Sequence, residues 1–196
     1  MPRDLIIATG NQGKFREIAG ELSGFFDRFH SLTDLPEKII VDEDAGNYAG
    51  NAWKKARKIG SRFNIPTLAD DSGLEVAALE GRPGIYSSRY GASDEERIER
   101  LLCELEGLPL NRRSAVFRAY LVFFMPDPGR GYIFYGSLHG YIGLERRGRG
   151  GFGFDPVFCP VDTNVCLAEL SLEEKNRISH RGKALRSFRQ FLEELH

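Results

Sequence analysis

Two adjacent carboxylates, Asp70 and Asp71, follow the short apolar run Thr67-Leu68-Ala69. Carboxylates at the carboxyl end of a strand are well placed to hold Mg²⁺ and to orient a water molecule. Because neighbouring side chains on an extended backbone point in opposite directions, we expect one of the two to face a site and the other to support it. A plain Asp-rich turn is the alternative interpretation.

A phosphate-binding turn is predicted in the segment Thr9-Gly10-Asn11-Gln12-Gly13-Lys14, which follows another apolar run. The pattern indicates a strand, a glycine-containing turn and a helix start, where backbone N–H groups and the helix dipole favour an anion. The segment is not a Walker A loop, because Phe15 replaces the Ser or Thr that would bind Mg²⁺ and Ala8 replaces the first glycine. A β–α turn with a surface lysine is the alternative.

The glycine-rich segment 148–153 contains the spacing G-x-G-x-x-G. A dinucleotide-binding fingerprint requires a following helix, but the strand-like Pro156-Val157-Phe158 follows here. We interpret the segment as a flexible loop that presents Phe152 and Phe154 for stacking on a base, with Asp155 accepting from a ring N–H. In the alternative interpretation, both phenylalanines belong to the hydrophobic core.

Further charged candidates lie at Glu43, in an acidic run, and at Lys175, His180 and Arg181, near the predicted junction of two helical segments. Taken singly, such groups are more often solvated surface. Together with the segments above, they meet the needs of a nucleoside triphosphate: phosphate donors, acids for a metal, aromatic rings for a base and cations.

The hydrophobic pattern predicts the elements that must position these residues. Strands are expected over 5–9, 67–69, 114–125 and 132–138, with a turn at 126–129. Helices are expected after the first turn, over 51–63, after the capping boxes Ser93/Glu96 and Ser171/Glu174, and at the C-terminal end. Helices and strands alternate first and hairpins follow, which favours a single α/β domain over 1–196 with a mixed sheet.

Composition excludes several classes of protein. The 196 residues carry 27 Lys and Arg against 28 Asp and Glu, a net charge of −1, which disfavours binding to a nucleic-acid polymer or a membrane surface. The apolar run 5–8 is too short for a signal segment or a membrane span. The three cysteines form no C-x-x-C, so we expect no disulfide framework and a reducing cytoplasm. The four histidines show no zinc-ligand spacing.

The chain resembles the inosine triphosphate pyrophosphatase family, the dITP/XTP pyrophosphatases. The resemblance rests on five separated matches in family order: residues 8–14, 68–74, 81–90, 151–158 and 168–182. It implies an elongated mixed α/β domain with two lobes flanking a nucleotide cleft, and a homodimer. It also implies Mg²⁺-dependent hydrolysis of ITP, dITP and XTP to the monophosphate and pyrophosphate.

The same resemblance implies a role for each candidate residue. Asp71 would be the catalytic acid that binds Mg²⁺ and activates water, Asp70 would support it, and Glu43 would lie near the metal. Substrate contacts are implied for Thr9, Gly10, Asn11, Gln12, Gly13, Lys14, Lys55, Ser72, Phe152, Gly153, Phe154, Asp155, Lys175, His180 and Arg181. Donors from His180 or Arg181 would pair with the oxygen at C6 of hypoxanthine or xanthine and would meet the amino group of adenine unfavourably.

Two departures from the family pattern affect the expected site. Gly50 replaces an acid near the metal, and Phe154 stands where Tyr or Trp is frequent. The rivals are a Maf-like nucleotide pyrophosphatase, against which Ser179-His180-Arg181 argues, and a non-catalytic nucleotide sensor, which could have lost its acids. A nucleic-acid-binding protein is a third rival, disfavoured by the charge.

Overall fold

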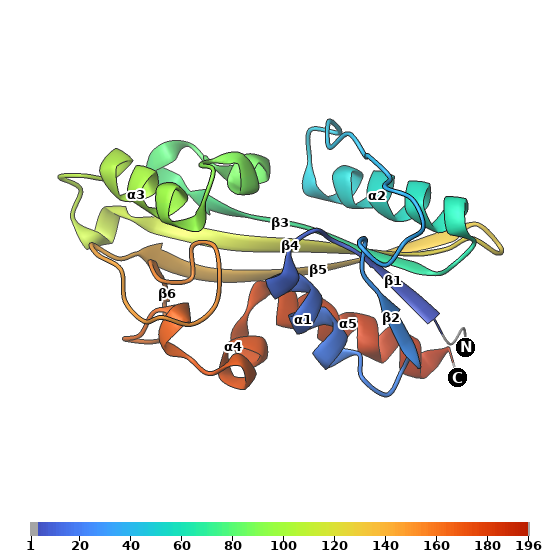
Figure 1. Cartoon of the computed structure of the whole chain (residues 1–196). Coiled ribbons are helices and arrows are strands. Elements are labelled where there is room, and N and C mark those ends of the chain that lie inside the picture. The colour runs from blue at the N-terminus through green and yellow to red at the C-terminus, as the bar shows by residue number, and fades with distance from the viewer. Residues whose placement is uncertain (1–3, 196) are drawn as a thin grey trace. The chain divides into compact units, whose positions relative to one another are not determined.

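The computed structural model describes residues 4–195 (Figure 1). Its strands are β1 (Asp4–Ala8), β2 (Arg28–His30), β3 (Thr67–Val76), β4 (Ser114–Met125), β5 (Arg130–Ile142) and β6 (Phe158–Pro160). Its α-helices are α1 (Gln12–Glu21), α2 (Tyr48–Phe63), α3 (Asp94–Glu104), α4 (Leu172–Ile178) and α5 (His180–Glu194). Among the residues described, no helix is both long and apolar enough to cross a bilayer.

The six strands form one mixed sheet in the order β2-β1-β3-β4-β5-β6. β1 pairs in parallel with both β2 and β3, and β5 pairs antiparallel with β6. The parallel pairing of β1 with β3 ends at Ala8 and Ala69, so Asp70 lies just beyond it. The predicted α/β class with a mixed sheet is therefore confirmed.

The chain groups into two compact units. Unit 1 comprises residues up to Asp71 together with 119–136 and 181 onward, and unit 2 comprises 72–118 and 137–180. Strands β3, β4 and β5 each contribute residues to both units.

Side-chain alternation in unit 1 divides its core between the two faces of the sheet. Leu68 on β3 packs with residues of α1 and α5 on one face, and Ala69 packs with residues of α2 on the other. Figure 1 shows α2 over one face, and α1 and α5 over the opposite face. Because successive strand residues point to opposite faces, Asp70 follows the direction of Leu68 and Asp71 that of Ala69.

The hydrophobic core of unit 2 is built on one face of its strands. Alternate residues Leu74 and Val76 of β3 pack with Ile98 and Leu101 of α3 and with the segment that precedes β6. Phe154 is part of this core, with 4% of its surface exposed and its ring edge-on to Tyr90 at 6.3 Å. The expectation that Phe154 stacks on a base is corrected, since a ring held in the core has no free face.

Several element boundaries follow the sequence prediction closely. β4 occupies the predicted 114–125, and the side chains of Ser93 and Ser171 cap α3 and α4 as expected. α2 begins at Tyr48 rather than at 51, because the Asn47 side chain accepts from the Gly50 N–H and caps the helix there.

One boundary is wrong in a way that matters for the site. β3 does not end at Asp70 in an Asp-rich turn but continues to Val76. It remains paired beyond Ala69 because β4 is its other neighbour in the sheet. The two carboxylates therefore lie inside a strand, where their directions are set by the sheet.

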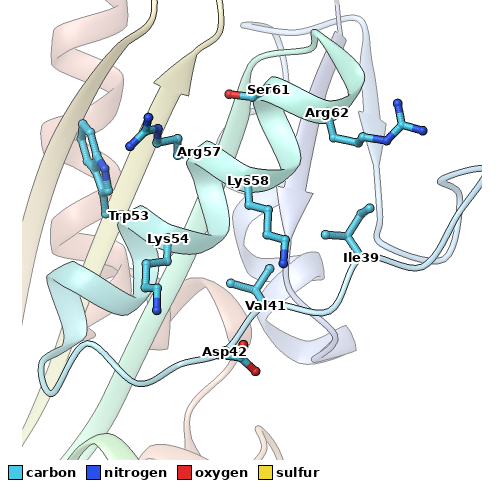
Figure 2. A pocket seen from close by; sticks show the side chains of 9 residues that line it. All are labelled: Ile39, Val41, Asp42, Trp53, Lys54, Arg57, Lys58, Ser61 and Arg62. Atoms are coloured by element: carbon cyan, nitrogen blue, oxygen red, sulfur yellow. The ribbon is translucent and has the colours of Figure 1, made fainter.

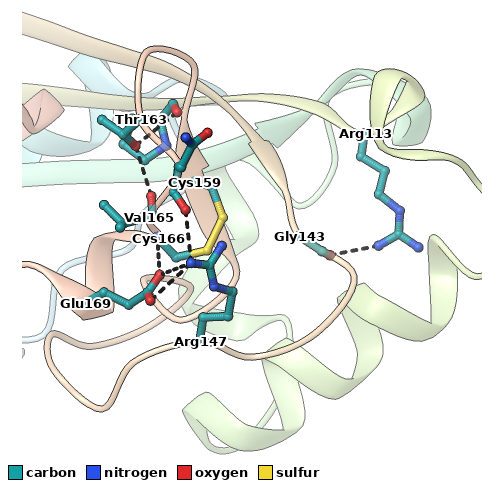
Figure 3. The surroundings of a disulfide bond; sticks show 10 residues. Arg113, Gly143, Arg147, Cys159, Thr163, Val165, Cys166 and Glu169 are labelled. Atoms are coloured by element: carbon teal, nitrogen blue, oxygen red, sulfur yellow. Dashed lines mark hydrogen bonds and ion pairs between the residues drawn. A yellow bond between two sulfur atoms is a disulfide. The ribbon is translucent and has the colours of Figure 1, made fainter.

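The cysteines, for which we expected no disulfide framework, include one bonded pair, Cys159 and Cys166. The chain turns after β6 and returns within seven residues, which brings the two sulfur atoms together (Figure 3). The returning segment of this loop is held by the Glu169 carboxylate, which accepts from the Cys166 N–H at 2.7 Å. Cys103 is free and exposed.

Candidate active site

Asp71 is held on the α2 face of the sheet in unit 1. Asn51 of α2, 1% exposed, donates from its Nδ2 to the Asp71 Oδ2 at 3.0 Å. The Lys55 ammonium lies 3.9 Å from the Asp71 Oδ1. Burial raises the pKa of Asp71 above its ordinary value, against the opposing charges of Lys55 and Lys14, and the neighbouring Glu43 raises it further. A buried carboxylate with a raised pKa suits general-base work.

Lys55 links this carboxylate to Glu43. Its ammonium donates to the main-chain oxygen of Asp70 at 2.9 Å and pairs with the Glu43 Oε1 at 2.9 Å. Glu43 comes from the irregular segment before α2, so its position depends on this ion pair and on the packing of that segment. Two carboxylates, those of Asp71 and Glu43, thus lie around one cation.

Asp70 is held on the opposite face of the sheet. Its carboxylate pairs with the Lys14 ammonium of α1 and accepts from Arg181 Nε at 2.9 Å. Burial opposes ionisation of Asp70, but the charges of Arg181 and Lys14 outweigh it and hold its pKa far below the ordinary range. Asp70 therefore stays ionised at neutral pH, which suits positioning and not proton transfer.

The network around Asp70 continues into the protein. Arg181 Nη1 donates to the Glu17 Oε2 of α1 at 2.6 Å, and both side chains are 3% exposed. Two nitrogens of Arg181 thus donate hydrogen bonds to two buried carboxylates, those of Asp70 and Glu17. These contacts hold the Arg181 side chain beside Asp70 and Glu17, and its contact with the substrate base stays a prediction.

The predicted phosphate turn joins β1 to α1. Asn11 caps α1, with its Oδ1 accepting from the Lys14 N–H at 3.0 Å, and its own N–H donates to the Thr9 hydroxyl at 3.1 Å. Gly10 and Gln12 are exposed, and Gly13 is half-buried. The side chain of Asn11 is thereby used inside the turn. The backbone N–H groups of the helix start, and the ammonium of Lys14, which also pairs with Asp70, are the donors proposed to meet an anion.

A second cluster of predicted residues lies in unit 2. Lys175 of α4, 3% exposed, donates to the Asp155 Oδ2 at 2.5 Å, and the Phe152 N–H donates to the same carboxylate at 2.8 Å. The Lys175 ammonium also lies 4.4 Å from the centre of the Phe152 ring. Phe152, Asp155 and Lys175 are therefore one packed group, and the Gly153 N–H is tied to Asp94 at 2.6 Å.

His180 and Ser72 also belong to unit 2. The His180 ring is 4% exposed and stacks on Phe117 at 4.6 Å and 9° between planes. It stands at the predicted junction, since α4 ends at Ile178 and α5 begins at His180. Ser72 follows Asp71 on β3 and is half-buried.

Residues that contact the predicted ones and that sequence reasoning missed include Glu17, Asn51, Asp94 and Phe117. Asn51 carried a signal, because it lies one helical turn before Lys55 and the pair shares a face of α2. Glu17 carried none, since its partner Arg181 is 164 positions away.

Among residues 4–195, no group of three or more acid, histidine or cysteine side chains forms a ready cage for a metal ion. Magnesium is usually bound by one or two carboxylates, with water and substrate phosphates completing its shell. Glu43 and Asp71 could supply the two carboxylates, because both lie beside the same positive charge, the Lys55 ammonium.

Comparison with known proteins covers nearly the whole chain. A dITP/XTP pyrophosphatase of Geobacter sulfurreducens is 47% identical over 184 residues, covering 92% of each chain. The HAM1 protein of Coxiella burnetii is 36% identical, covers 97% of this chain and 98% of its own, and superposes with a TM-score of 0.86. The Ham1 protein of Staphylococcus aureus is 35% identical, covers 98% of this chain and 100% of its own, and superposes with a TM-score of 0.87. The model of the Ham1 family matches residues 5–191, and this chain belongs to that family.

Proposed function

We propose that this protein hydrolyses non-canonical purine nucleoside triphosphates, namely ITP, dITP and XTP, to the monophosphate and pyrophosphate. The observation that carries the proposal is the Asp71 carboxylate, fixed by Asn51 and placed beside Lys55 and Glu43 in a chain of the Ham1 family. A curated relative with 47% identity bears the name dITP/XTP pyrophosphatase.

In the proposed mechanism, water attacks the α-phosphorus and Asp71 takes its proton. The raised pKa of Asp71 makes its carboxylate a stronger base than an ordinary aspartate. Asn51 fixes the orientation of that carboxylate. No cysteine or serine nucleophile is needed for this reaction.

Glu43 and Asp71 are the residues proposed to hold Mg²⁺. When bound, the ion would neutralise phosphate charge and lower the pKa of water. Lys55, which lies between the same two carboxylates, and Lys14 would stabilise negative charge on the phosphates and on departing pyrophosphate. The start of α1 and the turn residues Thr9 to Gly13 would contribute backbone donors.

Recognition of the base is assigned to unit 2. Lys175, held by Asp155, offers N–H donors that suit an oxygen at C6 and oppose the amino group of adenine. His180, Phe152, Gly153 and Ser72 are proposed as neighbouring contacts, as the family resemblance implies. Arg181 is proposed to position Asp70, to which its Nε donates, and to contact the base as the family resemblance implies.

We further propose that the protein is a homodimer, as the family resemblance implies, and that it acts in the cytoplasm on the nucleotide pool. The cysteine content does not support the cytoplasm, because Cys159 and Cys166 form a disulfide. Light scattering of the purified protein tests the dimer.

The function is tested by incubating the protein with ITP, dITP, XTP, ATP and GTP plus Mg²⁺. Pyrophosphate and phosphate are measured separately. We expect pyrophosphate from the first three and a rate for ATP lower by orders of magnitude. Release of phosphate alone, or equal rates for ITP and ATP, would contradict the proposal.

A further inference from the structure

A cavity of about 630 Å³ lies on the outward face of α2 in unit 1 (Figure 2). One wall is helix α2 and the other is the irregular segment around Ile39 and Val41. Its volume lies within the range of small-molecule sites in proteins. It is lined by Ile39, Val41, Asp42, Trp53, Lys54, Arg57, Lys58, Ser61 and Arg62.

Three of the four cations in the lining hold the facing segment against α2. Lys54 pairs with Asp44, Arg62 pairs with Glu37, and Lys58 donates to the main-chain oxygen of Ile40 at 2.7 Å. These contacts give the cavity two walls that are joined at several points along the helix.

Arg57 is the exception among these cations. Within residues 4–195, its guanidinium makes no hydrogen bond and no ion pair, although it is one of the residues that line the cavity. Because Lys54 and Arg62 have carboxylate partners and Lys58 has a carbonyl partner, Arg57 is the lining cation that is left to bind an anionic group of a ligand. A single such cation suits a ligand with one anionic group.

Trp53 supplies a flat, fixed apolar surface one helical turn before Arg57. Its ring packs edge-on against Phe124 at 6.4 Å, and the backbone of β5 lies so close that a Cβ at Gly131 would come within 2.5 Å of it. Figure 2 shows Arg57 directed toward the same side of the helix as Trp53. A planar group and an anionic group could thus be bound together.

We propose that this cavity is a ligand site for a planar organic compound carrying a single phosphate or carboxylate group. The indole of Trp53 contacts the planar part, and the Arg57 guanidinium binds the anionic group. Ile39 and Val41 complete the apolar lining. The site differs from the candidate active site, since none of its lining residues belongs to the Asp70 or Asp71 networks.

Such a ligand would bridge α2 and the segment that leads to Glu43. Val41 and Asp42 precede Glu43 directly, and Lys54 precedes Lys55. Binding at the cavity would restrict both elements that carry the Glu43–Lys55 ion pair. The monophosphate product of the proposed reaction has a purine ring and one phosphate, so it is a suitable ligand to test. The choice of this nucleotide as the probe rests on the proposed function, and the rest of the inference does not.

Trp53 is the sole tryptophan of the chain, so its fluorescence reports on this cavity. Inosine monophosphate is titrated into the protein with excitation at the red edge of the indole band, and inosine and inorganic phosphate are titrated separately. We expect a saturable change with the monophosphate and a weaker affinity for either part alone. Arg57→Gln should weaken binding roughly tenfold or more, since a charge-assisted hydrogen bond is lost.

Two control variants separate the cavity from other sites. Arg112→Gln, at an exposed arginine of unit 2, should bind like the wild type. Lys14→Ala, which removes a proposed phosphate contact of the active site, should keep the fluorescence response. No saturable change, an unaltered affinity in Arg57→Gln, or a response abolished by Lys14→Ala would each overturn the proposal. Because the titration needs no turnover, an inactive protein that still shows Arg57-dependent binding would contradict only the proposed function.

Discussion

Asp70 and Asp71 are consecutive on β3, yet their carboxylates enter separate networks on opposite faces of the sheet. Asp70 contacts Lys14 and Arg181, and Asp71 contacts Asn51. The alternation of side chains along a strand produces this division. It gives two chemically identical residues different roles, which the following substitutions distinguish.

Asp71→Asn should reduce kcat by roughly 10²–10⁴-fold, because the proposed general base is lost. The fold should be retained, since Asn51 can still hydrogen-bond to the new amide. Initial rates of pyrophosphate release measure the effect, and circular dichroism checks the fold. Asp162→Asn, at an exposed position, is the control and should be active. Near-normal turnover in Asp71→Asn would contradict the assignment.

Asp70→Asn should lower the free energy of unfolding by about 3–5 kcal/mol, because it leaves the charges of Arg181 and Lys14 without their buried partner. Asp71→Asn should cost much less, since burial already disfavours the charge of Asp71. Urea denaturation of both variants measures the difference. Equal losses of stability would show that the two carboxylates do not differ as the contacts indicate.

The stability contributed by Asp70 should depend on pH in a defined direction. Its folded pKa is lowered, so the folded state favours the ionised form. The stabilisation by ionised Asp70 is fully present at pH values above the pKa of the residue in the unfolded chain, about 3.9. It is lost as pH falls toward the pKa in the folded protein. The stability difference between wild type and Asp70→Asn should therefore be constant from pH 7 to 5 and shrink in stronger acid. If the stability difference between wild type and Asp70→Asn grew on acidification, the pKa of Asp70 would be raised by folding, and its assignment as the anion of a buried ion pair would be wrong.

Gly151→Ala should raise KM for ITP roughly tenfold or more, because small displacements of a binding group are costly. A Cβ at Gly151 would lie 2.1 Å from the Asp155 Oδ2, the atom that accepts from Lys175. Gly107→Ala, also in unit 2, is the matched control, since Gly107 has positive φ, no atom lies within 4 Å of its Cβ position and it is not among the proposed substrate contacts. Steady-state kinetics compare the two, and equal effects would attribute the change to backbone strain alone.

Cys166→Ser should lower the free energy of unfolding by about 2.5 kcal/mol, the chain-entropy value for a loop closed over seven residues. Reductant should destabilise the wild type by a similar amount and leave Cys166→Ser unchanged. Cys103→Ser, at the free and exposed cysteine, should behave like the wild type in both conditions. Thermal unfolding with and without reductant measures this, and a wild type insensitive to reductant would argue against the disulfide in solution.

Local patterns in the sequence determined much of the fold. The caps at Ser93 and Ser171, the strand over 114–125 and the junction before His180 were all predicted correctly. Each depends on residues a few positions apart, so spacing and side-chain chemistry suffice. The opposite directions of Asp70 and Asp71 followed in the same way from the period of a strand.

Only the tertiary structure decided which groups those directions meet. Arg181 reaches Asp70 across 111 positions and Glu17 across 164, and nothing local marks either partner. Likewise, the sequence pattern suggested that Phe154 is an exposed aromatic residue in a glycine-rich loop, whereas the structure places it in the core of unit 2. Burial and long-range ion pairs arise from how elements pack, so the sequence by itself determined which chemistry was present, and the packing decided which residue performs each part.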